Sequence, residues 1–120
     1  MKIKGLVIAT VFALSSISGA FAADNIAQTF QSGWGNVAGT AQNGFRNFSI
    51  TGQSGIANHS ATVQFGAYNA SGTAQFGVGN HSTTVQGGLG NVSATIQSGF
   101  GNNSLTVQSG VGNSSTTIQH

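Results

Sequence analysis

The sequence lacks cysteine and proline and has very little charge: three Lys or Arg and one Asp or Glu in 120 residues. Without cysteine, no disulfide can hold a small exported domain together. Without proline, the chain lacks the residue that best interrupts strand pairing. The scarcity of charge removes a common protection against association between molecules. Aliphatic residues are also too scattered to predict an ordinary apolar core, so backbone pairing and stacked side chains must hold the chain together.

Residues 1–22 have the pattern of a secretory signal peptide. Two lysines, Lys2 and Lys4, precede an apolar run over residues 5–14, and residues 20–22 form an A-x-A cleavage site. The apolar run is too short for a convincing membrane span. We expect cleavage after Ala22, which leaves a short N-terminal segment, residues 23–30, and a repeat domain, residues 31–120.

Removal of this peptide takes away both lysines and excludes several classes of function. Residues 23–120 keep one acidic residue, Asp24, and one basic residue, Arg46, so no basic patch is available for a nucleic acid. They contain no Glu, Lys or Cys, so neither a catalytic carboxylate pair nor an oriented triad can form. We therefore expect a protein that is not an enzyme, with no small-molecule substrate, cofactor or nucleic-acid partner.

An eleven-residue repeat fills the rest of the chain. Each of eight units reads Q-x-G-x-(G)-N-x-S-x-T-x, with Ala38 at the serine position of the first unit. A short fixed period indicates one structural unit stacked on copies of itself. The recurring glutamines, asparagines and first glycines are Gln31, Gln42, Gln53, Gln64, Gln75, Gln86, Gln97, Gln108 and Gln119; Asn36, Asn47, Asn58, Asn69, Asn80, Asn91, Asn102 and Asn113; and Gly33, Gly44, Gly55, Gly66, Gly77, Gly88, Gly99 and Gly110.

The repeat predicts an all-β solenoid. Its glycines suit a sharp turn, and N-x-S-x-T-x-Q alternates with a period of two, as a strand does. Two units make a rung of about 22 residues with two strands, and eight units make four rungs. Rungs stacked about 4.8 Å apart give two parallel sheets that face each other and can extend into cross-β fibrils. Arg46, Ala57 and Tyr68 replace the second glycine of the turn and make three turns less favourable.

Either face of each strand could lie inside. The Asn, Ser, Thr and Gln positions hardly vary, and side chains locked between two sheets tolerate little change in size. Their amides can also bond along the stack, so we expect this polar face inside. The alternative places the variable face, which carries Val and Ile residues such as Val85 and Ile96, in the interior as hydrophobicity alone would favour.

These residues resemble the curlin repeat of bacterial curli subunits, Q-x-G-x-G-N-x-(A/S)-x-x-x-Q. Residues 75–86, QFGVGNHSTTVQ, match every fixed position of it, and the match recurs over about 90 residues. The resemblance implies an extracellular amyloid fibre subunit of a Gram-negative cell surface, a curli-type pilus that supports biofilm and adhesion. It also implies that the Gln and Asn residues form stacking ladders. The implied partners are the chain itself, a related major or minor curlin subunit, and an outer-membrane secretion pore with accessory proteins; the role of major subunit is slightly favoured over that of nucleator.

Two other functions compete with this interpretation. His59 and His81 are two repeat units apart and should stack on one outward column, but no third ligand is close in sequence, so we predict no metal site. A monomeric ice-binding solenoid would use the threonine column from Thr40 to Thr117, which would then have to face outward.

Overall fold

The structure is a computed structural model that describes residues 24–120; the predicted signal peptide lies outside the described residues. The described residues form nine strands joined by tight turns: β1 (Ile26–Trp34), β2 (Val37–Phe45), β3 (Phe48–Ile56), β4 (His59–Ala67), β5 (Ala70–Val78), β6 (His81–Leu89), β7 (Val92–Phe100), β8 (Asn103–Val111) and β9 (Ser114–Gln119). In residues 24–120 there is no helix that is long and apolar enough to cross a membrane.

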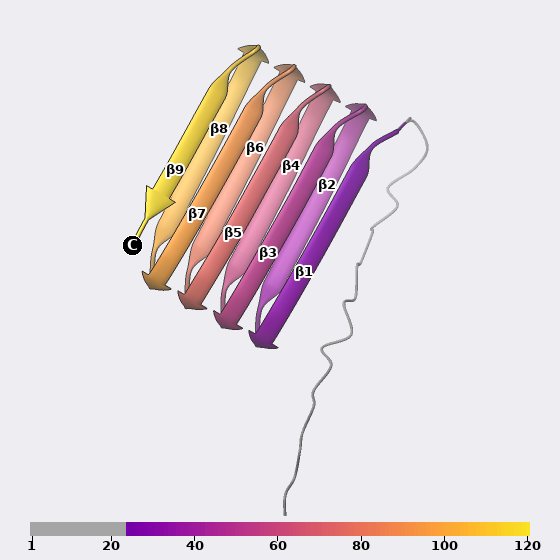
Figure 1. Ribbon diagram of the computed structural model, residues 1–120. Helices are drawn as coiled ribbons and strands as arrows, with labels where there is room; N and C mark the ends of the chain where they lie inside the picture. Colours follow the sequence, from indigo (N-terminus) through magenta and orange to yellow (C-terminus); the bar gives the residue numbers. More distant parts are fainter. Residues whose placement is uncertain (1–23) are drawn as a thin grey trace, which may run out of the picture.

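The strands alternate between two parallel sheets, as Figure 1 shows. The five-stranded sheet has the order β1-β3-β5-β7-β9, and the four-stranded sheet has the order β2-β4-β6-β8. Each strand pairs in register with the strand one rung away, so Gln53 lies beside Gln75 and Gln75 beside Gln97. The predicted all-β solenoid of about four turns, with two eleven-residue units in each rung, is confirmed.

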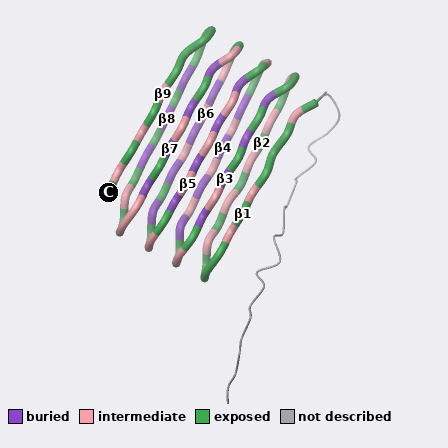
Figure 2. Tube along the Cα trace, viewed as in Figure 1, coloured by how far each residue is buried: buried purple, intermediate pink, exposed green. Residues whose placement is uncertain are grey.

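The interior between the sheets is polar. Among the described residues no hydrophobic side chain is buried, whereas the Asn, Ser, Thr and Gln positions from Asn47 to Gln97 are buried at every rung. Figure 2 shows buried positions alternating mainly with intermediate ones along the central strands. The expectation of a polar interior is therefore confirmed, and the alternative with Val and Ile inside is wrong. Hydrogen bonding along the stack, rather than apolar burial, satisfies the inward amide side chains.

The two glycines of each turn have different roles. The first, such as Gly77, has a φ of 119°, and a Cβ there would overlap the carbonyl oxygen of Gly99 on the next rung. The second, such as Gly79, has a φ of 67° and open space around a Cβ. Arg46, Ala57 and Tyr68 adopt this second conformation with φ between 53° and 58°. The left-handed region is accessible to such residues at a cost, which explains why only the second glycine varies.

The solenoid begins before the first glutamine. Strand β1 starts at Ile26, within the segment of residues 23–30 that the sequence analysis left outside the repeats. The stretch from Asn25 to Gln31, NIAQTFQ, already has the asparagine, threonine and glutamine of a strand unit. This second half of the repeat, taken without the glutamine and glycines that open a unit, is the sequence signal for the ninth strand.

Candidate assembly site

Glutamine side chains form two continuous ladders, which we define as columns of identical side chains bonded from rung to rung. In each step Nε2 of one glutamine donates to Oε1 of the glutamine one rung later, at 2.7–2.8 Å. Because every step has the same direction, each ladder has a donor end and an acceptor end. One ladder runs through the five-stranded sheet and the other through the four-stranded sheet: Gln31, Gln53, Gln75, Gln97 and Gln119; and Gln42, Gln64, Gln86 and Gln108.

The same amides tie the two sheets together. Nε2 of Gln75, on β5, also donates to the backbone oxygen of His59, at the start of β4 in the facing sheet, at 3.0 Å. Gln86 makes the equivalent bond to Ala70 in the opposite direction, also at 3.0 Å. Both amide hydrogens are thus used, one along the stack and one across the interior. A shorter or apolar side chain at this position would leave several buried groups unpaired.

Asparagine side chains hold the turns in the same repeating way. Nδ2 of Asn80 lies within 3.1 Å of Oδ1 of Asn58 and of the backbone oxygens of Phe76 and Gly99. Its backbone N–H donates to Oδ1 of Asn58 at 3.2 Å. Asparagines two repeat units apart form two such ladders, and both run opposite to the glutamine ladders, because the later residue donates to the earlier one.

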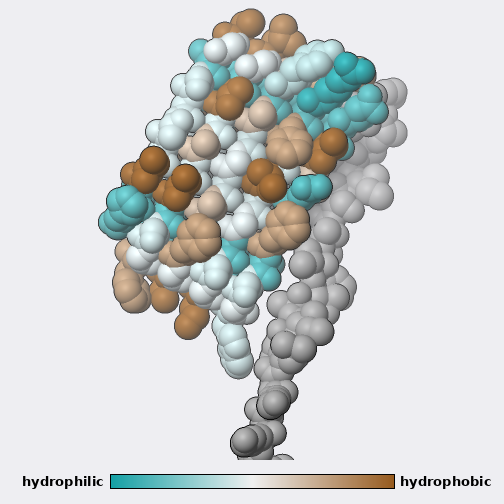
Figure 3. All heavy atoms as spheres, in the orientation of Figure 1, coloured by the Kyte–Doolittle hydropathy of each residue, from teal (hydrophilic) through white to brown (hydrophobic). Residues whose placement is uncertain are grey.

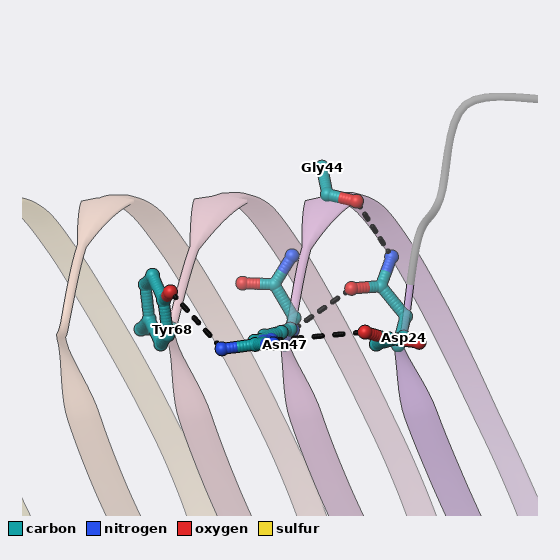
Figure 4. A network of polar contacts seen from close by, with 6 residues as sticks. Asp24, Gly44, Asn47 and Tyr68 are labelled. Carbon is teal, nitrogen blue, oxygen red and sulfur yellow. Dashed lines mark hydrogen bonds and ion pairs between the residues drawn. The ribbon is translucent and has the colours of Figure 1, made fainter.

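Asn25 is a member of an asparagine ladder that the sequence analysis missed. Its Oδ1 accepts the backbone N–H of Asn47 at 2.8 Å, and its Nδ2 donates to the backbone oxygen of Gly44 at 3.2 Å (Figure 4). It precedes the first glutamine by six positions, as every later asparagine precedes its own glutamine. This asparagine ladder thus begins at the residue immediately before β1.

Serine and threonine fill the middle of the interior without the same bonding. The hydroxyls of Ser82, Thr84, Ser93 and Thr95 are buried and have no hydrogen-bond partner among the described residues. The inward threonines contribute packing and β-branched backbone preference. The buried threonine column also removes the outward array that ice binding would need, since Thr51, Thr62 and Thr84 are each at most 1% exposed.

Both ends of the stack expose unpaired strand edges and unfinished ladders within residues 24–120. At one end, Gln108 and Gln119 use Nε2 for the bond across the interior but have no glutamine to donate to. At the other end, Oε1 of Gln31 and of Gln42 accepts no hydrogen bond from the described residues. An open edge with unpaired N–H and C=O groups is a template for another strand.

The outward faces are rich in exposed apolar side chains. In the space-filling view, which has the orientation of Figure 1, apolar side chains lie among small and polar ones over the visible face (Figure 3). The five-stranded sheet carries a shallow apolar groove of about 350 Å³, over Gly52 and Gly72 and beside Phe30, Ile50 and Ile96. Exposed apolar surface of this kind is typical of surfaces that associate.

His59 and His81 lie side by side on the outer face of the four-stranded sheet, as their spacing of two repeat units predicts. Their ring centroids are 4.6 Å apart and their ring planes differ by 2°. Within the part of the chain that the structure describes, no group of three His, Cys, Asp or Glu side chains gathers that could hold a metal ion. The two imidazole rings form a stacked aromatic contact.

A small charged and aromatic cluster covers the turns near β1. Arg46 approaches Asp24 at 3.7 Å between Nε and Oδ2, and its Nη1 donates to the Tyr68 hydroxyl at 3.4 Å (Figure 4). The guanidinium also lies 4.8 Å from the centre of the Phe45 ring. Because these groups are largely exposed, the ion pair contributes little to stability.

In comparison with known proteins, no protein-family model and no curated protein sequence matches this chain. The geometry defines the class of the molecule: a β-solenoid of about four rungs whose interior contains stacked Asn and Gln ladders.

Proposed function

We propose that this chain is the structural subunit of an extracellular, curli-like amyloid fibre, and that it assembles by stacking solenoids end to end. The observation that carries the proposal is the pair of open ends, where the glutamine ladders stop with unused amide groups on Gln108 and Gln119 and unused oxygens on Gln31 and Gln42. A second copy that adds there extends both sheets and both ladders. Contacts of this kind do not close on themselves, so a fibre grows.

Three further features support assembly. Charged side chains are almost absent from the described residues, so little electrostatic repulsion opposes association. Proline is absent, so no strand edge is blocked. Exposed apolar side chains such as Phe76 and Phe100 give the fibre surfaces that can bind each other or a support.

The cellular setting comes from the sequence. The predicted signal peptide takes the chain across the inner membrane, and the resemblance to curlin repeats supplies the outer-membrane pore, accessory proteins and related subunit as partners. The function is then mechanical: a fibre that gives cohesion to a biofilm and adhesion to surfaces. The length and regularity of the stack favour the role of fibre-forming major subunit. Ice binding is not favoured, because its threonine column is buried.

Fibre diffraction tests the proposal directly. Residues 23–120 are diluted out of denaturant and left to assemble, and the expected result is fibres with reflections near about 4.7 and about 10 Å. A chain that stays monomeric would contradict self-assembly as its intrinsic activity. Surface immunolabelling of cells that express the full chain, compared with a version lacking residues 1–22, tests the extracellular location.

A further inference from the structure

The described chain has an odd number of strands, and this determines which strand edges are open to a second copy at each end of the stack. Nine strands alternate between the sheets, so the stack ends on β9 in one sheet and on β8 in the other. At the opposite end it begins with β1 and β2. If the solenoid path continued beyond β9, the next strand would lie on β8, in the four-stranded sheet.

The ladder ends make the two ends complementary. Near β8 and β9, Gln108 and Gln119 present amide hydrogens, while Oδ1 of Asn102 and of Asn113 accepts no hydrogen bond from the described residues. Near β1 and β2 the glutamine ladders present oxygens, because their amides already donate to the next rung. Two copies can therefore satisfy each other head to tail, whereas two identical ends would oppose donor to donor or acceptor to acceptor.

We propose that a second copy of this chain docks head to tail after a half-turn about the stack axis, so that its β1 pairs with β8 and its β2 pairs with β9. The inference rests on the proposed function, since it specifies how the subunits of such a fibre meet. Each sheet of the fibre then continues from the five-stranded sheet of one subunit into the four-stranded sheet of the next.

This register completes all four ladders with one offset. Gln108 donates to Gln31 of the incoming copy and Gln119 to its Gln42, an offset of seven repeat units in both cases. The asparagines fit the same offset, which places Asn25 and Asn36 of the incoming copy beside Asn102 and Asn113. The backbone N–H groups of Asn25 and Asn36 can then donate to the free Oδ1 atoms of Asn102 and Asn113, as the later asparagine does in every step inside the chain.

Docking without the half-turn leaves half of these ladder ends without a hydrogen-bond partner. Placing β1 of the incoming copy on β9 leaves a gap one strand wide above β8. Gln108 and Asn102 then keep unpaired groups at the edge of a buried interior, and Gln42 of the incoming copy gains no partner. Each unpaired buried polar group is unfavourable, so the half-turn register is preferred.

The two registers also differ in symmetry. Nine strands at about 4.8 Å per two-strand rung give a rise of about 22 Å per subunit, combined with a rotation of about 180° before any fibre twist. Docking without the half-turn gives about 24 Å per subunit and no such rotation, because one strand position stays empty.

Paired cysteines distinguish the registers, since the chain has no cysteine of its own. Gln28, on the outer face of β1, would lie beside Leu105 of β8 in the half-turn register and beside Thr116 of β9 in the other. Neighbouring strands place such Cα atoms about 4.8 Å apart, within the range of a disulfide. The variants are Gln28→Cys with Leu105→Cys and, as the matched control, Gln28→Cys with Thr116→Cys. Each variant is assembled into fibres under reducing conditions. The fibres are then oxidised and dissolved in denaturant.

The half-turn register predicts a series of disulfide-linked multimers from the Gln28/Leu105 variant. It predicts mainly monomers, with only background amounts of dimer, from the Gln28/Thr116 variant. Multimers from the Thr116 variant alone, or equally from both, would overturn it. Cryo-electron microscopy of the unsubstituted fibre gives a second test, because a rotation near 0° with a rise of about 24 Å would also overturn it. Failure of the unsubstituted chain to form fibres would instead contradict the proposed function.

Discussion

The side-chain amide of Gln75 donates to Oε1 of Gln97 at 2.7 Å, and both side chains are completely buried between the sheets. The same bond recurs from rung to rung, so one substitution interrupts a ladder on both sides of its position. Gln97 also donates to the backbone oxygen of His81 at 2.9 Å and to Gln119 at 2.8 Å.

We expect Gln97→Ala to lower the free energy of unfolding by about 2–4 kcal/mol, because it leaves several buried groups unpaired. Guanidinium denaturation and seeded growth rates measure the effect. Thr95→Val, two residues earlier on β7, is the matched control. The Thr95 hydroxyl has no partner among the described residues, so a methyl group of similar shape should change stability by less than about 1 kcal/mol. Equal effects of the two variants would contradict the importance of the ladder.

The two glycines of one turn should respond differently to the same substitution. In Gly77→Ala the added methyl group would clash with the carbonyl oxygen of Gly99, whereas in Gly79→Ala no atom lies close to the added methyl group. We expect Gly77→Ala to abolish fibre formation and Gly79→Ala to cost about 1–2 kcal/mol, the penalty of the left-handed conformation. Circular dichroism and electron microscopy of both variants check this, and Gly77→Ala fibres that grow at the normal rate would disprove the steric argument.

A glycine at position 57 should stabilise the fold. Ala57 has a φ of 55°, so Ala57→Gly relieves backbone strain and we expect a gain of up to about 1 kcal/mol. Ala61→Gly, on β4, is the control with the same chemical change, and it should destabilise by about 0.5–1 kcal/mol because glycine weakens a strand. The measurement is the denaturation midpoint of each variant, and effects of the same sign would refute the explanation.

Positive charge in the outer column of His59 and His81 should slow assembly. The two rings stack with centroids 4.6 Å apart, so the variant that carries both His59→Lys and His81→Lys places like charges on neighbouring strands, where they repel. Asn103 already occupies the next position in this column, so the variant with His59→Asn and His81→Asn is a matched uncharged control. We expect slower seeded growth of the lysine variant than of the asparagine variant.

The repulsion weakens at high ionic strength, so added salt should restore part of the lysine variant's growth rate. Equal growth rates of the two double variants at low salt would show that charge in this column does not control assembly.

The repeat predicted most of the fold because its signals are local. Glycines two positions after each glutamine indicate the turn, and alternation around Ser and Thr indicates the strand, so a rung of two repeat units follows from chain geometry. The glutamine and asparagine ladders also follow from the period, because identical side chains one rung apart must lie beside each other. The start of strand β1 is not part of any unit that opens with glutamine, because only the second half of a repeat, starting at Asn25, precedes Gln31.

The sequence by itself determined the period, the turns and the identity of the stacked side chains, since each depends on spacing along the chain. The uniformity of the polar positions favoured that face as the interior, but only the tertiary structure decided it, because alternation defines two faces of a strand without assigning either to the interior. It also decided the opposite directions of the Gln75 and Asn80 ladders, which depend on which neighbour each amide reaches in three dimensions. The different tolerance of Gly77 and Gly79 has the same origin, because the carbonyl oxygen that excludes a side chain at Gly77 belongs to the next rung.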